Sequence, residues 1–297
     1  MKKSKFRQMS TGDRVFTIVN YSLLMLVLII ELYPLVYVVA ASFSDPQAVV
    51  SGKVFLFPVN PTLKGYAAVF KNKKILTGFS NSIFYLIVGT VLNLVMTMLC
   101  AYPLSRKEFR ARGFLSMFFV FTMYFSGGII PTFLVVKNLG MYDSLSSLYI
   151  PQAINVFNFI VMRTFFRQLP ESLEEAAKID GASDMGVLLK IVLPLSVPII
   201  ATIGLFYAVQ YWNSYFDALI YIQSPDKFTL QLRLRSLLFA DELNNAGGGN
   251  VEGIGTQVMT QSLKMACVAV STIPILLVYP WLQKYFVKGV MLGSVKG

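Results

Sequence analysis

Six long apolar segments constrain this chain more than any other feature of its sequence. Each is long enough for one helical crossing of a bilayer, which takes about 20 predominantly apolar residues. The chain is 55% hydrophobic and only 14% charged over 297 residues, a composition typical of membrane proteins. We therefore predict an all-α, polytopic membrane protein with six transmembrane helices. The expected spans are residues 15–41, 79–103, 113–136, 146–166, 191–222 and 261–282.

The first and the fourth of these spans differ from the others. Basic residues precede the first span, as in a signal peptide, but its apolar run exceeds the usual core of about 7–15 residues. We therefore expect an uncleaved first helix. The fourth span is the least apolar, because Gln152, Asn155 and Asn158 interrupt it. A polar stripe on a spanning helix is expected to face the bundle interior or a water-filled path.

Basic residues in short loops predict the orientation of the chain. The tail over residues 1–14 is basic, and the loop after the second span carries four basic residues against one acid, Glu108. Both are expected on the cytoplasmic side, and six crossings return the tail over residues 283–297 to that side. The predicted organisation is thus a transmembrane domain over residues 15–282 between two cytoplasmic tails.

The polar segment over residues 170–190 predicts a helix-turn-helix in a cytoplasmic loop. Pro170 ends the preceding helix, and Ser172 with Glu175 fits a capping box at the start of the next one. Acidic residues in the first turn favour the positive end of the helix dipole. Gly181 predicts its C-terminal break. An ordinary surface helix is the alternative, but an element this polar is expected to be held by another protein.

The spacing of this segment resembles the signature loop of permeases of binding-protein-dependent ABC importers. The pattern is Glu-Ala-Ala, three residues, Gly, nine residues and Ile-x-Leu-Pro. The chain is similar to the carbohydrate importers of the maltose type, and more so to permeases for polysaccharide-derived oligosaccharides. The matching positions are Glu175, Ala176, Ala177, Gly181, Ile191, Leu193 and Pro194, and the closer likeness lies in residues 125–128, 211–213 and 293–297.

The resemblance implies the type I ABC importer permease fold and a bacterial cytoplasmic (plasma) membrane location. It implies five kinds of partner: a second homologous permease, two ATPase subunits, an extracellular solute-binding protein, an oligosaccharide and membrane lipid, with no nucleic acid. The tail over residues 285–297 resembles the family's extension along the ATPase dimer; a loosely held basic tail is the alternative. The implied ATPase-coupling surface comprises Glu174, Glu175, Ala176, Ala177, Asp180 and Gly181. Its alanines would enter a cleft of the ATPase and its acids would pair with basic groups on the rim.

The sequence offers no chemistry of its own for hydrolysis. It contains no phosphate-binding loop of the Gly-x-x-x-x-Gly-Lys type and no histidine. We expect a non-catalytic subunit without cofactor or metal, so that ATP and Mg²⁺ would bind to the partner ATPase. A secondary transporter driven by an ion gradient is the alternative, although that class is expected to show paired intramembrane charges.

The fifth span holds the densest group of polar and aromatic residues. Gln210, Asn213 and Asp217 are spaced to share one helix face, and Trp212 lies between them. Amides, carboxylates and aromatic rings suit sugars, so these four residues are the predicted substrate path. Hydrogen bonding between helices is an equally good explanation.

The predicted outer face is unexpectedly basic. Two hypotheses fit: steering of an acidic oligosaccharide, or docking of an acidic surface of the binding protein. The last outer loop also contains Asn244, Asn245, Gly247 and Gly248, which are compatible with a loop that reaches into the binding protein, or with a flexible linker. The outer basic residues are Lys53, Lys64, Lys71, Lys73, Lys74, Lys227, Arg233 and Arg235.

Overall fold

A computed structural model describes residues 10–237 and 261–277, and within these ranges the chain is helical without strands. It divides into two compact units. The first unit holds residues 261–271 and three helices: α1 (Thr11–Ser42), α2 (Pro46–Val50) and α3 (Lys64–Lys71). The second unit contains the elements from α4 to residue 236, together with residues 272–277.

In the first unit, α1 is one continuous helix of 32 residues, which confirms the predicted first span as a single helix. Ser10 caps it, since its hydroxyl accepts the backbone N–H of Asp13 at 3.2 Å. Most apolar side chains of α1 are exposed, as expected for a helix that faces lipid. Its last turn buries Ala40 and Ala41 against residues of α2 and the loop that follows.

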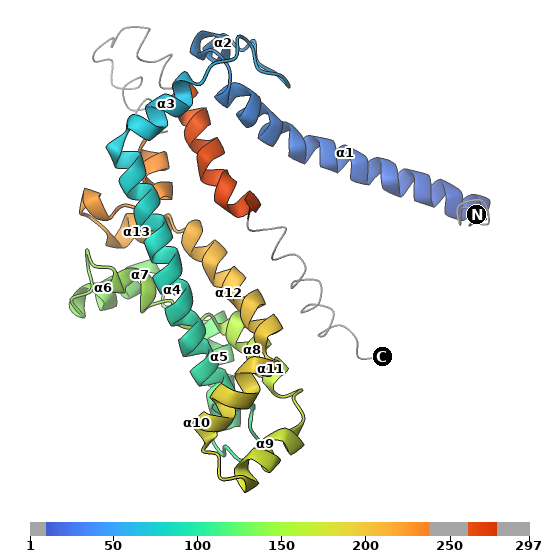
Figure 1. Cartoon of the computed structure of the whole chain (residues 1–297), viewed down its shortest axis with the longest axis vertical. Helices are drawn as coiled ribbons and strands as arrows, with labels where there is room; N and C mark the ends of the chain where they lie inside the picture. The colour runs from blue at the N-terminus through green and yellow to red at the C-terminus, as the bar shows by residue number, and fades with distance from the viewer. Residues whose placement is uncertain (1–9, 238–260, 278–297) are drawn as a thin grey trace. The chain divides into compact units, whose positions relative to one another are not determined.

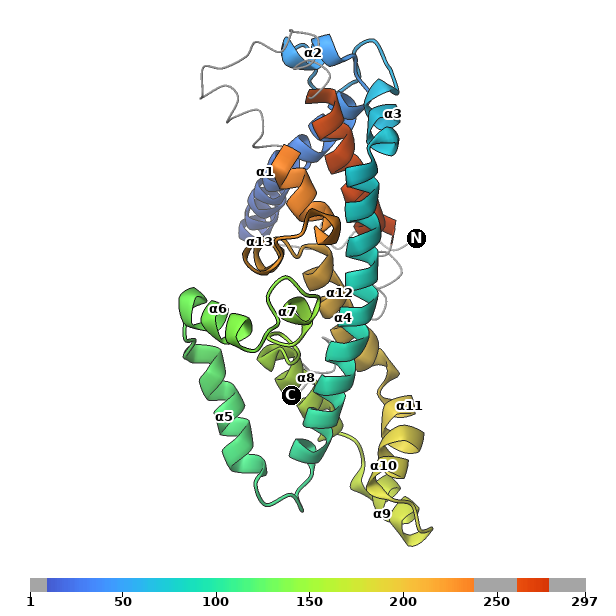
Figure 2. The ribbon, with the colours of Figure 1, turned by 90° about the vertical axis from the view of Figure 1, so that its left-hand side faces the viewer.

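In the second unit, α4 (Lys73–Ser105) is the central helix, and its 33 residues span about 50 Å. It lies beside α12 (Val197–Trp212) and α8 (Val156–Phe166) (Figures 1 and 2). Gly89 of α4 permits a close approach, because a Cβ atom there would collide with the ring of Tyr211. The predicted second span is therefore confirmed as a helix that packs on its partners through one face.

The third predicted span is not one helix. It is divided into α5 (Arg112–Tyr124) and α6 (Ile129–Asn138), whose axes differ by 117°. The break falls at Gly127 and Gly128, and Gly128 has a φ of +87°, a conformation that favours glycine. The apolar pattern runs through this break, so hydropathy alone could not show it.

The fourth and fifth predicted spans are broken as well. In the fourth, α7 (Ser146–Tyr149) ends before Pro151, and α8 begins only at Val156. In the fifth, the axis turns by 84° at Ser196, and α12 ends at Trp212 before the short α13 (Phe216–Tyr221). Proline at Pro151 and Pro198 removes a backbone donor at each break.

The described residues contain two single helices, α1 and α4, that are long and apolar enough to cross a membrane, and up to four spans if each bent pair counts as one. The sixth predicted span is helical over Gln261–Leu277, the part that the structure describes. The total of six crossings remains a prediction.

Candidate coupling site and transport path

The Glu-Ala-Ala segment forms α9 (Glu171–Ile179), which is followed by α10 (Asp184–Val187). Both lie beyond the C-terminal end of α4 (Figure 2). Pro170 occupies the N-cap position, and no side chain caps the helix. The predicted capping box is therefore wrong. Because α9 starts directly after Pro170, Ser172 is already helical and lacks the extended backbone that a cap requires.

The C-terminal end of α9 follows the prediction. Gly181 has a φ of +83°. The N–H of Ala182 donates to the carbonyl of Ala177 at 2.9 Å, and the N–H of Gly181 donates to the carbonyl of Lys178 at 3.1 Å. This pair of bonds is a Schellman motif. It reverses the chain within two residues, so that α10 packs against α9.

The residues of α9 divide between two faces. Glu174 is buried, with 8% of its surface exposed, and Ala177 packs against the hydrophobic core. Glu175, Ala176 and Ile179 point outward, and Ile179 is 85% exposed. Asp180 and Gly181 are also exposed. Of the six predicted coupling residues, Glu174 and Ala177 thus contact their own chain, and the other four are accessible.

Ion pairs connect α9 to its surroundings. The Glu174 carboxylate pairs with Arg106, the first residue after α4. Burial raises the pKa of Glu174, and the Arg106 guanidinium opposes this rise. Nearby, Lys107 lies 2.6 Å from Glu171 and lowers the pKa of that carboxyl through a hydrogen bond. The expectation that Glu174 offers its charge to a partner does not match this geometry, because its carboxylate already has an internal cation.

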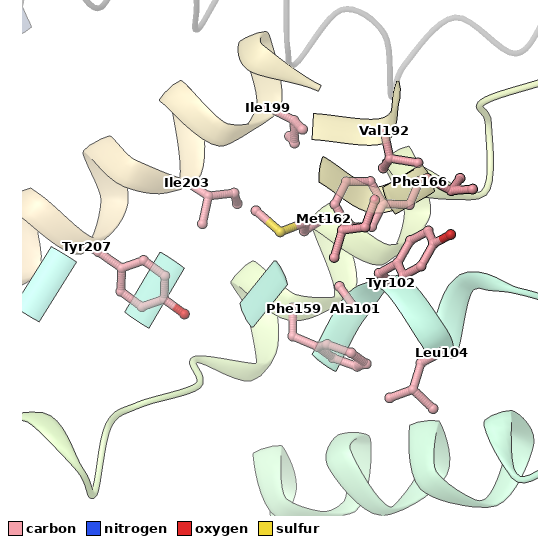
Figure 3. Packing of buried hydrophobic residues seen from close by; sticks show 12 residues of the cluster. Ala101, Tyr102, Leu104, Phe159, Met162, Phe166, Val192, Ile199, Ile203 and Tyr207 are labelled. Carbon is pink, nitrogen blue, oxygen red and sulfur yellow. The ribbon is translucent and has the colours of Figure 1, made fainter. Parts of the chain in front are cut away.

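A hydrophobic core lies directly behind α10 and the π-helical turn η2 (Leu188–Val192) (Figure 3). Val187 and Val192 belong to the same cluster as Phe166 and Met162 of α8, and all four side chains are almost completely buried. Residues of α4 and α12 complete the cluster. The polar loop is therefore packed onto the helices that form the membrane domain. The cluster consists of Ala101, Tyr102, Leu104, Phe159, Met162, Phe166, Val187, Leu188, Val192, Ile199, Ile203 and Tyr207.

The predicted substrate path is only partly assembled. The side-chain amide of Gln210 donates to Gln152, and the amide of Gln152 donates to the carboxylate of Asp217. Asn213 takes no part in this chain of hydrogen bonds. It is the C-cap residue directly after α12, and its amide donates back to the carbonyl of Val209 at 3.0 Å. The prediction of one shared helix face for Gln210, Asn213 and Asp217 is wrong, because α12 stops at Trp212.

The remaining path residue, Trp212, is buried with its ring edge-on to Phe79, at 5.7 Å between centroids. The polar stripe predicts an inward or path-facing position for Gln152, which its hydrogen bonds match, but the sequence does not predict its pairing with Gln210 and Asp217. Sequence reasoning also missed the buried pair of Thr97 and Tyr207, whose hydroxyls are 2.7 Å apart. Their signal is weak, since each is a single polar group within an apolar run.

Four predicted residues, Asn244, Asn245, Gly247 and Gly248, lie outside the described residues, and so does the tail over residues 285–297. Beside the N-terminal part of α4, far from α9, Asp143 binds the segment before the 3-10 turn η3 (Pro225–Lys227). Asn81, near the start of α4, donates to the carbonyl of Asp226 in the same turn. The N-terminal part and the C-terminal end of α4 are thus connected to different loops.

Comparison with known proteins identifies the class. Residues 6–292 match the family described as "binding-protein-dependent transport system inner membrane component". The chain belongs to this family. It is a permease component of a binding-protein-dependent ABC importer, as its Glu-Ala-Ala loop predicts.

Individual relatives match this chain over nearly its whole length. The polygalacturonan/rhamnogalacturonan transport system permease protein YtcP of Bacillus subtilis is 45% identical over 96% of this chain and 99% of its own length. Protein LplC of the same organism is 44% identical over 96% of each chain. A crystal structure of a bacterial ABC transporter involved in the import of the acidic polysaccharide alginate matches with a TM-score of 0.86 and 36% identity, over 94% of this chain and 99% of that one. The match confirms the predicted permease fold.

Proposed function

We propose that this permease imports acidic oligosaccharides and is driven through α9 by a separate ATPase. The observation that carries the coupling role is the division of α9 into two faces. Its inner face is bound to its own chain through Glu174 and Ala177. Its outer face presents Glu175, Ala176 and the exposed Ile179. A small residue between an acid and an apolar side chain suits insertion into a cleft that has a basic rim.

The proposed assembly contains a second homologous permease, two ATPase subunits and an extracellular binding protein. The family description supports the binding protein and the membrane location. ATP and Mg²⁺ would bind to the ATPase subunits. The side that carries α9, with both tails, would be cytoplasmic, and η3 would lie outside. The basic loop that contains Arg106 and Lys107 next to α9 supports this orientation.

The acidic substrate is proposed from two similar proteins. One is named for polygalacturonan and rhamnogalacturonan transport, and the other for import of the acidic polysaccharide alginate. The net charge of this chain, +11 at pH 7, is compatible with anionic substrates. Gln210, Gln152 and Asp217 would line the path, and their amides and carboxylate offer donors and acceptors for sugar hydroxyls.

The test is ATP-driven uptake in proteoliposomes that contain the complete complex. We expect wild type to import acidic oligosaccharides in preference to neutral ones of equal length. Glu175→Lys combined with Gly181→Asp should abolish ATP-driven uptake, since the first change reverses an exposed charge and the second strains a left-handed turn. Pull-down of the ATPase with the membrane subunits measures docking in the same preparations.

Asp226→Lys is the matched control, because it makes the same charge reversal at an exposed position beside the N-terminal part of α4, far from α9. It should leave ATPase docking intact. Unchanged uptake by the α9 variant, with the ATPase still bound, would contradict the coupling role. Equal uptake of acidic and neutral sugars by wild type would contradict the substrate proposal alone.

A further inference from the structure

We infer that Arg106 and Glu174 form the mechanical link between the coupling helix α9 and the transport helix α4. The inference rests on the proposed coupling role of α9. Arg106 follows α4 directly, and its guanidinium lies 4.7 Å from the ring centroid of Tyr102, in the last turn of that helix. On its other side, the guanidinium pairs with Glu174. One side chain therefore joins the end of α4 to the inner face of α9.

Burial makes the separation of this pair costly. The side chains of Arg106 and Glu174 are 14% and 10% exposed, well below the values for the pairs Lys178–Asp184 and Lys227–Asp143. Solvent screens such a pair little, and separating it would leave a charge buried without a partner. The neighbouring pair of Lys107 and Glu171 is 68% and 59% exposed, so that it is well screened and contributes little.

The connection from α9 to the membrane helices has two branches. One passes through Arg106 to α4. The other passes through the turn at Gly181 to α10, η2 and the hydrophobic core that α12 shares. Because α4 and α12 pack against each other, a displacement of α9 that reaches only one of them would strain their contact. The ion pair lets α9 move both helices together.

Cavities beside the pair give α9 room for such a displacement. One of about 400 Å³ is lined in part by Tyr102, Arg106 and Lys178. Another of about 200 Å³ is lined in part by Arg106, Glu171 and Glu174. Side chains that line an open cleft make fewer packing contacts across it than side chains in a closed core. Arg106 borders both clefts, so its ion pair with Glu174 bridges α9 and the end of α4 where they leave space, beside the packing of Ala177 against the hydrophobic core.

Docking and transmission are thus assigned to different residues of one helix. Glu175, Ala176 and Ile179 would contact the ATPase, while Glu174 would act only within this chain. Arg106 and Glu174 are positioning residues in this scheme. Loss of the pair should leave the ATPase bound and able to hydrolyse ATP but should reduce the oligosaccharide imported for each ATP hydrolysed.

The experiment measures that ratio in proteoliposomes with the complete complex, using an oligosaccharide that wild type imports. Arg106→Gln and Glu174→Gln should each lower the ratio roughly tenfold, which lies within the usual range of coupling between distant sites. Arg106→Lys keeps the charge and should lower it less. The exchange of Arg106→Glu with Glu174→Arg should restore most of the ratio. Lys107→Gln, in the exposed neighbouring pair, is the control and should leave it unchanged.

Three results would overturn the inference: a wild-type ratio in both glutamine variants, loss of the ATPase from the Glu174→Gln complex, or an equal defect in Arg106→Lys and Arg106→Gln. If the variant with Arg106→Glu and Glu174→Arg does not assemble, the comparison of Arg106→Lys with Arg106→Gln still tests the inference. Failure of the proposed coupling role itself would appear separately, as continued ATP-driven uptake by the Glu175→Lys and Gly181→Asp variant.

Discussion

At the residue scale, Asp143 shows how one carboxylate can hold two distant loops together. Its Oδ1 accepts the backbone N–H groups of Gln223 and Ser224, both at 2.9 Å. Its Oδ2 accepts the hydroxyl of Ser224 and lies 3.4 Å from Nζ of Lys227. These bonds, led by that from the Ser224 hydroxyl, hold the pKa of Asp143 well below its usual range. A φ of 54° places Asp143 in a region that aspartate tolerates better than most residues.

We predict that Asp143→Asn lowers the melting temperature of the purified complex at pH 7. Because the folded-state pKa is depressed, the stabilisation is complete above the ordinary aspartate value of about 3.9 and disappears as the pH falls through the lower folded-state value. Thermal unfolding of wild type and variant between neutral and acidic pH checks this. The difference in melting temperature between wild type and Asp143→Asn should be constant down to about pH 4 and should narrow below that pH. Asp226→Asn is the control, and a difference that narrows at higher pH would contradict the prediction.

At the element scale, the breaks in the apolar segments decide which residues meet. The break between α7 and α8 places Gln152 outside any helix, where it hydrogen-bonds both Gln210 and Asp217. The same segment is fixed to α4, because the amide of Asn93 donates to the carbonyl of Gln152 at 2.9 Å. A continuous fourth helix could not make these contacts. Breaks of this kind are tolerated at membrane depth only where protein or water satisfies the backbone.

The contact between α4 and α12 supplies a prediction at this scale. Gly89→Ala should destabilise the complex by about 1–3 kcal/mol, the usual cost of overpacking, because the new Cβ collides with the ring of Tyr211. Thermal unfolding in detergent measures the effect. Gly113→Ala is the matched control, since nothing lies within 4 Å of its added Cβ. Equal stability of the two variants would show that the ring of Tyr211 moves aside without cost.

At the scale of the whole molecule, the structure places three of the basic residues predicted for the outer face against groups of their own chain. Lys227 is bound to Asp143, and Arg233 donates to the carbonyl of Pro225 while its guanidinium covers Phe228, so both have internal partners. The guanidinium of Arg235 lies 4.7 Å from the ring centroid of Tyr215, which directly precedes α13 and its Asp217. A cation on an aromatic face near the predicted substrate path suits a sugar that carries a carboxylate.

We therefore expect Arg235→Gln to reduce uptake of acidic oligosaccharides roughly fivefold, the factor given by about 1 kcal/mol of partly screened attraction. Uptake of neutral oligosaccharides of equal length should change little, and Arg235→Lys should retain most of the preference. Transport assays with both sugars at low and high salt provide the measurement. An equal loss for both sugars, with weaker affinity for the binding protein, would instead assign Arg235 to docking.

The order of apolar and polar segments determined the class of this protein without any tertiary information. Bilayer dimensions require long apolar runs, and the spacing from Glu175 to Pro194 identified the family that the comparisons confirm. Local rules also predicted the turn at Gly181, because only the backbone of a few neighbouring residues decides it. Such features depend on short stretches of chain.

Tertiary structure decided which groups meet across the fold. The inward orientation of Glu174 depends on Arg106, which lies far away in the sequence. The hydrogen bonds of Gln152 with Gln210 and Asp217 depend on breaks that hydropathy does not show, since an apolar run looks the same whether its helix is continuous or bent. Periodicity describes one helix at a time, whereas pairing between helices follows from packing, in which a single glycine such as Gly89 sets how closely two helices approach.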